Sequence, residues 1–117
     1  MKKLTKVNKF KKSVIKYQDY FALFQWEIHV FEKTMENRAE VIWNDTGGIV
    51  SVYYSKKWIE DKDVDLNEVD KVAFHEMAEL FLQEQYDLIG RSNGWDKAQK
   101  QTHNIIRFLE NKVYPTI

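Results

Sequence analysis

The sequence contains no cysteine. Disulfide bonds, thiolate zinc sites and cysteine nucleophiles are therefore excluded, and histidine, aspartate and glutamate are the strong metal ligands that the chain can offer. Histidine is itself scarce, because the chain has only His29, His75 and His103. Any metal site that uses histidine must be built from these residues.

Long apolar runs are also missing. No stretch approaches the roughly 20 apolar residues that a membrane-spanning helix requires. The start of the chain, MKKLTKVNKFKKSVIKYQ, carries charges throughout and lacks the apolar run that follows the basic residues of a secretory leader. We therefore expect a cytoplasmic protein with no membrane partner.

Acidic residues are missing from the start of the chain, although the formal net charge of the whole chain is zero. Only lysines carry charge before Asp19, and such a basic start could contact nucleic acid or an acidic lipid surface. Apolar residues recur at helical spacing between these lysines, which favours the solvated face of an amphipathic helix. The apolar positions are Val7, Phe10, Val14, Tyr17 and Phe21. We therefore do not expect nucleic acid to be the partner.

The chain has 117 residues, of which 44% are hydrophobic and 15% are aromatic. This length suits one domain, and the apolar side chains suffice to offset the entropy cost of ordering it. We predict a single folded domain over residues 1–117.

The middle third of the chain has the pattern of β-strands. In the sequence FQWEIHVFE, Trp26, Ile28 and Val30 alternate with residues that would face the other side. The sequences RAEVIWND and IVSVYYS are rich in β-formers, and TGG between them is typical of a turn. We predict an antiparallel meander of three strands, with Gly47 and Gly48 closing the second hairpin.

The last half of the chain changes to helical periodicity. The pattern predicts a long helix over residues 65–89, with Asp65 or Asn67 as its N-cap. The sequence GRSNG predicts a break, and a final helix follows over residues 95–114. The predicted fold class is α+β, with an N-terminal helix, a three-stranded antiparallel meander and then two packed helices.

The long helix carries a candidate metal site in the sequence VAFHEMAEL. His75 and Glu79 are four residues apart, so their side chains project from one helix face and can bind one ion. Glu76 is rotated by about 100° from His75, where a carboxylate can reach a metal-bound water without binding the metal itself. Its neighbours are apolar, and a half-buried glutamate there needs a bound cation, or else a lysine or arginine partner.

A catalytic zinc needs three protein ligands and one open position, and two histidines with one carboxylate are a workable set. The third ligand must come from outside the long helix. His103 is our choice, because the final helix can fold back across the break; His29, on a predicted strand, ranks second. The predicted zinc ligands are therefore His75, Glu79 and His103. Glu76 is the predicted catalytic general base.

Together these pieces resemble a family of small zincin-like proteins encoded by bacteriophages and prophages. Members of that family have a basic first helix, a Trp-x-Ile strand, a short meander, a helix with His-Glu-x-x-His, and a final helix with a histidine and an Arg-Leu-Glu-Asn-like end. The matching sequences here are WEIHV, NRAEVIW, GIVSVYYSKKW, VDKVAFHEMAELFL and THNIIRFLEN. They cover nearly the whole chain after the first helix.

The resemblance implies a minimal metallopeptidase fold, in which helices hold zinc beside the edge strand of a small sheet. His75 corresponds to the first ligand, Glu76 to the general base and Glu79 to the second ligand. His103 corresponds to the histidine of the final helix. The chain departs from the family motif at Glu79, which replaces a histidine; a carboxylate also binds zinc, but it lowers the positive charge of the metal centre. By analogy, IVSVYYS is the edge strand that faces a peptide substrate.

Two functions follow as hypotheses. The first is a zinc-dependent hydrolase, a metallopeptidase-like phage protein that acts on a peptide or protein. Its oxyanion donor would be one of four tyrosines, Tyr53, Tyr54, Tyr86 or Tyr114. The alternative is a non-catalytic phage accessory or assembly protein, with a structural or vestigial metal site, that acts by binding a partner. If the protein is phage-encoded, we expect it in the cytoplasm of the bacterial host.

Overall fold

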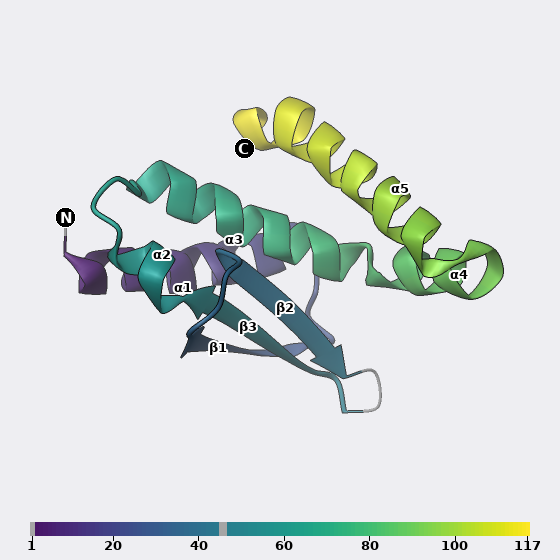
Figure 1. Cartoon of the computed structure of the whole chain (residues 1–117), viewed down its shortest axis with the longest axis horizontal. Coiled ribbons are helices and arrows are strands. Elements are labelled where there is room, and N and C mark those ends of the chain that lie inside the picture. The colour runs from purple at the N-terminus through teal and green to yellow at the C-terminus, as the bar shows by residue number, and fades with distance from the viewer. Residues whose placement is uncertain (1, 45–46) are drawn as a thin grey trace.

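The computed structural model describes residues 2–44 and 47–117, so Asp45 of the predicted second strand and Thr46 of the predicted turn lie outside the described residues. The chain is α+β, as predicted, and Figure 1 shows its elements. They are α1 (Lys3–Tyr20), β1 (Glu27–Lys33), β2 (Ala39–Asn44), β3 (Ile49–Ser55), α2 (Lys56–Glu60), α3 (Leu66–Phe81), α4 (Gln83–Asn93), α5 (Trp95–Phe108), the π-helical turn η1 (Leu109–Val113) and the 3-10 turn η2 (Tyr114–Thr116).

The main core lies between one face of the sheet and the helices α1 and α3, which run side by side (Figure 1). The predicted apolar stripe of the first helix is buried at Val7, Phe10, Val14 and Tyr17, so its amphipathic character is confirmed. The sheet contributes alternate residues of β3, among them Val50 and Val52, which have no exposed surface. This alternation is what a strand with one buried face requires.

The predicted antiparallel meander is wrong, because the strand order is β1-β3-β2 and β1 is parallel to β3. The hairpin of β2 and β3 is antiparallel as expected, with Val41 opposite Val52. A period-2 pattern identifies a strand but does not say which strands lie beside it. The central place goes to β3, whose inward residues are fully buried, while β1 is mostly exposed and occupies an edge. IVSVYYS is therefore not an edge strand, and the edge strand beside α3 is β2.

The helix boundaries also differ from the prediction. The predicted helix over residues 65–89 is interrupted at Leu82, where α3 gives way to α4. Gly90 lies inside α4. Only glycine fits at this position, because a Cβ there would lie 2.0 Å from the Trp95 ring. The second interruption is at Gly94, whose φ of 96° lies in a region that suits glycine.

The start of α3 is as predicted, and the structure chooses between the two candidate caps. The Asp65 carboxylate accepts a hydrogen bond from the Glu68 backbone N–H at 2.8 Å, so Asp65 is the N-cap. Within the described ranges, no helix combines the length and the apolar character needed to span a membrane.

Candidate metal centre

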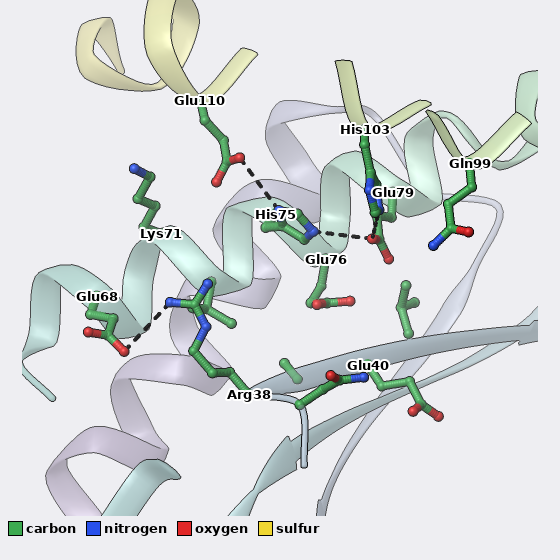
Figure 2. Close-up of a pocket in the computed structure, with 14 residues that line it drawn as sticks. Arg38, Glu40, Glu68, Lys71, His75, Glu76, Glu79, Gln99, His103 and Glu110 are labelled. Carbon is green, nitrogen blue, oxygen red and sulfur yellow. Dashed lines mark hydrogen bonds and ion pairs between the residues drawn. The ribbon is translucent and has the colours of Figure 1, made fainter. Parts of the chain in front are cut away.

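A cavity of about 550 Å³ lies between α3, the start of β2 and the C-terminal helical segment (Figure 2). Because α3 packs on the sheet through its apolar stripe, its adjoining polar face is turned toward this cavity. The ionisable side chains that line the cavity are Arg38, Glu40, Glu68, Lys71, His75, Glu76, Glu79, His103 and Glu110. Carboxylates outnumber cationic side chains in this set, so the cavity favours a bound cation.

The Glu79 carboxylate lies between two histidines from different helices. Its Oε1 is 3.1 Å from Nε2 of His75 and 4.0 Å from Nε2 of His103. The two imidazole rings are 6.4 Å apart between centroids. The interruptions at Leu82 and Gly94 turn the chain back, so α5 brings His103 to the helix that carries His75 and Glu79.

His29, the second choice for a third ligand, is not brought to this cavity. It lies on β1, at the edge of the sheet opposite β2, and its Nε2 is 3.3 Å from the Glu27 carboxylate. Its side chain is half exposed. This arrangement is typical of a surface ion pair.

The donor atoms are of the kind that zinc takes. Nitrogen and oxygen ligands at zinc bond lengths in a tetrahedral site lie about 3.4 Å from one another; Glu79 Oε1 is slightly closer than this to His75 and slightly farther than this from His103. In the described residues, the group whose possible ligand atoms all lie within 4.8 Å of one another is His75, Glu76 and Glu79. The predicted third ligand, His103, lies outside this group, and the predicted base, Glu76, lies within it. The set is nitrogen and oxygen only, which suits zinc and other borderline divalent ions.

Glu76 is the most unusual residue of the cavity. Its side chain is only 5% exposed, and its Oε2 atom is the one buried side-chain nitrogen or oxygen in the described residues that has no hydrogen-bond partner. Burial, and then the nearby charge of Glu79, raise the pKa of Glu76 well above the range of an ordinary glutamate. A cation in the cavity would reverse this effect and stabilise the carboxylate form.

His75 shows the complementary effect. The hydrogen bond with Glu79 raises the pKa of His75 to about 9, although burial acts in the opposite direction, and the charges of Glu79, Glu76 and Glu110 add to the increase. The metal-free site therefore holds a positive imidazolium among carboxylates at neutral pH. A metal ion that binds Nε2 must displace its proton.

The sequence reasoning missed Glu110, which η1 brings to the cavity. Its Oε1 atom is 3.6 Å from Nδ1 of His75, and its side chain is only 18% exposed. Glu110 follows His103 by seven residues, which is about two helical turns. This spacing places both residues on one helix face and is the signal by which Glu110 could have been found.

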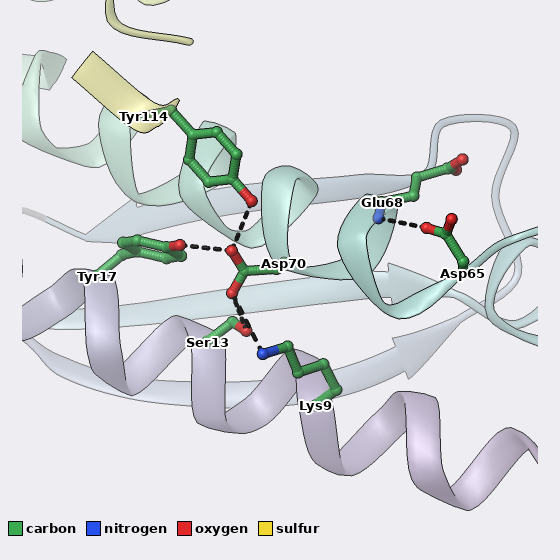
Figure 3. Close-up of polar contacts among 7 residues, drawn as sticks. All are labelled: Lys9, Ser13, Tyr17, Asp65, Glu68, Asp70 and Tyr114. Carbon is green, nitrogen blue, oxygen red and sulfur yellow. Dashed lines mark hydrogen bonds and ion pairs between the residues drawn. The ribbon is translucent and has the colours of Figure 1, made fainter. Parts of the chain in front are cut away.

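A second missed feature is a buried carboxylate, Asp70, between α1 and α3 (Figure 3). Ser13 donates a hydrogen bond to it at 2.7 Å, Tyr17 at 2.5 Å and Tyr114 at 2.6 Å. Lys9 lies 3.7 Å from the same carboxylate. Burial alone would raise the pKa of Asp70, but these hydroxyl donors and Lys9 outweigh it and hold the pKa below its usual value.

The four tyrosines considered as oxyanion donors lie in different places. Tyr114 donates its hydroxyl to Asp70, and Tyr54 is buried in the main core. Tyr53 packs against Phe31. Tyr86 lines a smaller cavity of about 250 Å³ that also contacts Glu79 and His103. Of the four, Tyr86 is therefore the one whose side chain borders the candidate metal centre.

Any function of this protein has to be argued from its own residues and their geometry. Comparisons of this chain with protein-family models, with curated proteins and with solved structures find no match.

Proposed function

We propose that this protein is a zinc-dependent hydrolase that cleaves peptide bonds. His75, Glu79 and His103 hold the ion, and Glu76 is the general base. The observation that carries the proposal is the close group of donor atoms from His75, Glu76 and Glu79, in which a buried Glu76 oxygen lacks a partner. His103 borders this group, with its Nε2 atom 4.0 Å from Glu79. The resemblance to small zincin-like phage proteins agrees with this assignment of roles.

Zinc, when bound, supplies Lewis acidity that polarises a carbonyl and acidifies water. Glu76 accepts the proton from the attacking water and passes it to the leaving amine. The Glu76 side chain is only 5% exposed, and this burial strengthens its interaction with charged groups in the cavity. His75 and His103 approach Glu79 from separate helices, which fixes the donor atoms before the substrate arrives.

The substrate would lie along β2. This strand is at the edge of the sheet, and Ala39, Glu40 and Val41 line the cavity beside α3. An extended peptide can add to such an edge through main-chain hydrogen bonds. β2 thus takes the role that the sequence analogy gave to IVSVYYS.

The first test is elemental analysis of protein purified without a chelator, where we expect one zinc for each chain. The second is peptide hydrolysis by wild type and by Glu76→Gln. The substitution should keep zinc bound and lower turnover by about 10²- to 10⁴-fold, since it removes the base but no ligand. Undiminished turnover in Glu76→Gln would disprove the mechanism.

A partner-binding role without catalysis is the second candidate. Large apolar side chains on α5 favour it, because Trp95, Ile105 and Phe108 are 51%, 42% and 60% exposed. Exposed apolar side chains gathered on one element are common at protein interfaces. Bound zinc together with no hydrolysis of any peptide in a broad library would support this second candidate.

A further inference from the structure

The C-terminal end of α5 is not a regular helix. Residues Leu109–Val113 form the π-helical turn η1, and Tyr114 follows immediately. π-Helical turns are uncommon, and they are found frequently at functional sites because they change the direction in which side chains project. This turn carries Glu110, whose side chain points toward His75 (Figure 2).

Both ring nitrogens of His75 face a carboxylate. Nε2 is 3.1 Å from Glu79 on the same helix, and Nδ1 is 3.6 Å from Glu110 on η1. The two nitrogens point away from each other across the ring, so Glu110 is on the side opposite to Glu79 and His103. A carboxylate at that position accepts a hydrogen bond from Nδ1–H, which keeps the proton on Nδ1 and leaves the Nε2 lone pair for a metal.

We propose that Glu110 is a positioning residue that fixes the orientation and tautomer of His75, and that the hydrogen bond between Tyr114 and Asp70 holds Glu110 in place. The metal-binding part of this inference rests on the proposed function. Glu110 is not itself a ligand, because an ion on Nε2 is out of its reach across the ring. Its distance of 3.6 Å from Nδ1 is that of an ion pair, and we expect it to shorten to a hydrogen bond when zinc fixes the ring.

The hydrogen bond between Tyr114 and Asp70, which we call the anchor, joins the same two segments as the contact between Glu110 and His75. Tyr114 is four residues after Glu110, and Asp70 is five residues before His75, so two parallel contacts connect the C-terminal turns to α3. The Tyr114 hydroxyl donates to Asp70 at 2.6 Å, and its ring packs against Phe74 with centroids 5.0 Å apart (Figure 3). Asp70 is 9% exposed and also accepts hydrogen bonds from α1, so it is a fixed point.

The test compares zinc affinity in the full chain, by competition with a chromogenic chelator, for wild type, Glu110→Ala and Glu84→Ala. We expect Glu110→Ala to weaken zinc binding by about 10- to 100-fold. Glu84→Ala is the control, because Glu84 is an exposed carboxylate on α4, and its affinity should match wild type. The ligand-field bands of bound Co²⁺ should show the same coordination number in Glu110→Ala as in wild type, because no ligand is lost. A wild-type zinc affinity in Glu110→Ala, or a changed coordination number, would overturn the positioning role.

Tyr114→Phe tests the anchor, and the fold should survive it because Asp70 keeps its bonds from Ser13 and Tyr17. We expect a smaller loss of zinc affinity, and no further loss when Tyr114→Phe is added to Glu110→Ala. Additive losses in the double variant would show that Tyr114 acts on zinc binding independently of Glu110, and the anchor would be wrong.

A readout without metal separates this inference from the proposed function. The chain has only three histidines, so the imidazole nitrogens of His75 can be assigned by NMR with the help of His29→Gln and His103→Gln. In metal-free protein, Glu110→Ala should move the Nδ1 resonance of His75, and Glu84→Ala should leave it unchanged. If wild type binds no zinc, the proposed function fails, and this spectrum alone decides whether Glu110 orients His75. An unmoved Nδ1 resonance then rejects the inference as well.

Discussion

Glu79 is the residue on which the candidate centre converges, since its Oε1 atom lies near histidines of both α3 and α5. The Glu79 carboxylate can still bind a metal, as a histidine would, but it also places a second negative charge beside the buried Glu76. In the metal-free site, the hydrogen bond with Glu79 raises the pKa of His75, and burial together with the Glu79 charge raises the pKa of Glu76, so that both residues bind a proton more readily. Both effects make the behaviour of single residues depend on pH.

The His75 imidazole makes zinc binding depend on pH. In the metal-free fold, the hydrogen bond with Glu79 raises the pKa of His75 from its ordinary value of 6.5 to about 9. Its proton must leave when Nε2 binds zinc, so zinc affinity should rise with pH up to about 9, by at most about tenfold for each pH unit. Isothermal titration in several buffers measures this dependence and the protons released. His29→Gln should keep the wild-type profile, and a flat profile in wild type would contradict the assignment of His75 as a ligand.

The buried Glu76 should destabilise the metal-free protein. Burial raises its folded-state pKa above the ordinary value of 4.5, so the free energy of unfolding falls as the pH rises from that value toward the folded-state pKa. Glu76→Gln removes this cost and should raise the free energy of unfolding at pH 7 by about 1 to 2 kcal/mol. The gain should be smaller at pH 5. Urea denaturation in the presence of chelator measures both, with Glu84→Gln as the control; a loss of stability at pH 7 would contradict the prediction.

At the scale of elements, α3 contributes both to the hydrophobic core and to the candidate metal centre. One face packs in the core with α1 and the sheet, and the adjoining face supplies His75, Glu76 and Glu79 to the cavity. Its buried Asp70 connects it to α1 and to the C-terminal turn at once. The position of α3 along the chain therefore decides which side chains reach the cavity, and its N-cap sets that position.

The cap of α3 can be tested by a matched pair. Asp65→Ala removes the side chain that accepts the Glu68 N–H, and it should lower the free energy of unfolding by about 1 kcal/mol. Asn67→Ala, at the rival cap position two residues later, should cost much less because Asn67 is exposed within the first turn. Thermal or urea unfolding measures both. Equal losses in the two variants would show that Asp65 is not the cap.

At the scale of the molecule, the chain is elongated, with extents of 45 × 32 × 27 Å, because α4 and α5 extend beyond the sheet (Figure 1). The helix α5 is joined to α3 through His103, Glu110 and Tyr114, and through Ile106, which packs with Ala78 and Leu82 in a small second core. A metal held by α3 and α5 would connect these two parts of the fold.

Zinc should therefore stabilise the whole molecule. At a free zinc concentration about 100 times the Kd, mass action adds about 2.7 kcal/mol, which corresponds to a rise in Tm of about 10 °C for a chain of this size. Differential scanning calorimetry with and without a chelator measures the rise. It should be much smaller in His103→Ala and unchanged in His29→Ala. Equal rises in both variants would remove His103 from the ligand set.

The local features of this protein were predictable from its sequence. Periodicity identified the amphipathic first helix and the three strands, and Asp65 was one of two candidate caps. The four-residue spacing of His75 and Glu79 put their side chains on one helix face. Each of these features depends on neighbours within a few residues, so the sequence alone contains the necessary information.

Only the tertiary structure decided how these elements meet. It placed β3 in the centre of the sheet and β2 beside the cavity, because strand order depends on pairing between segments that are distant in the chain. It turned α5 back so that His103 approaches Glu79, and it brought Glu110 and Asp70, which the sequence reasoning missed, into contact with α3 and the C-terminal turns. These contacts join residues far apart in the chain, and they form only because the packed core holds the helices together. For the same reason, the sequence predicted the residue types of the site, whereas the fold determined which of them lie within reach of one another.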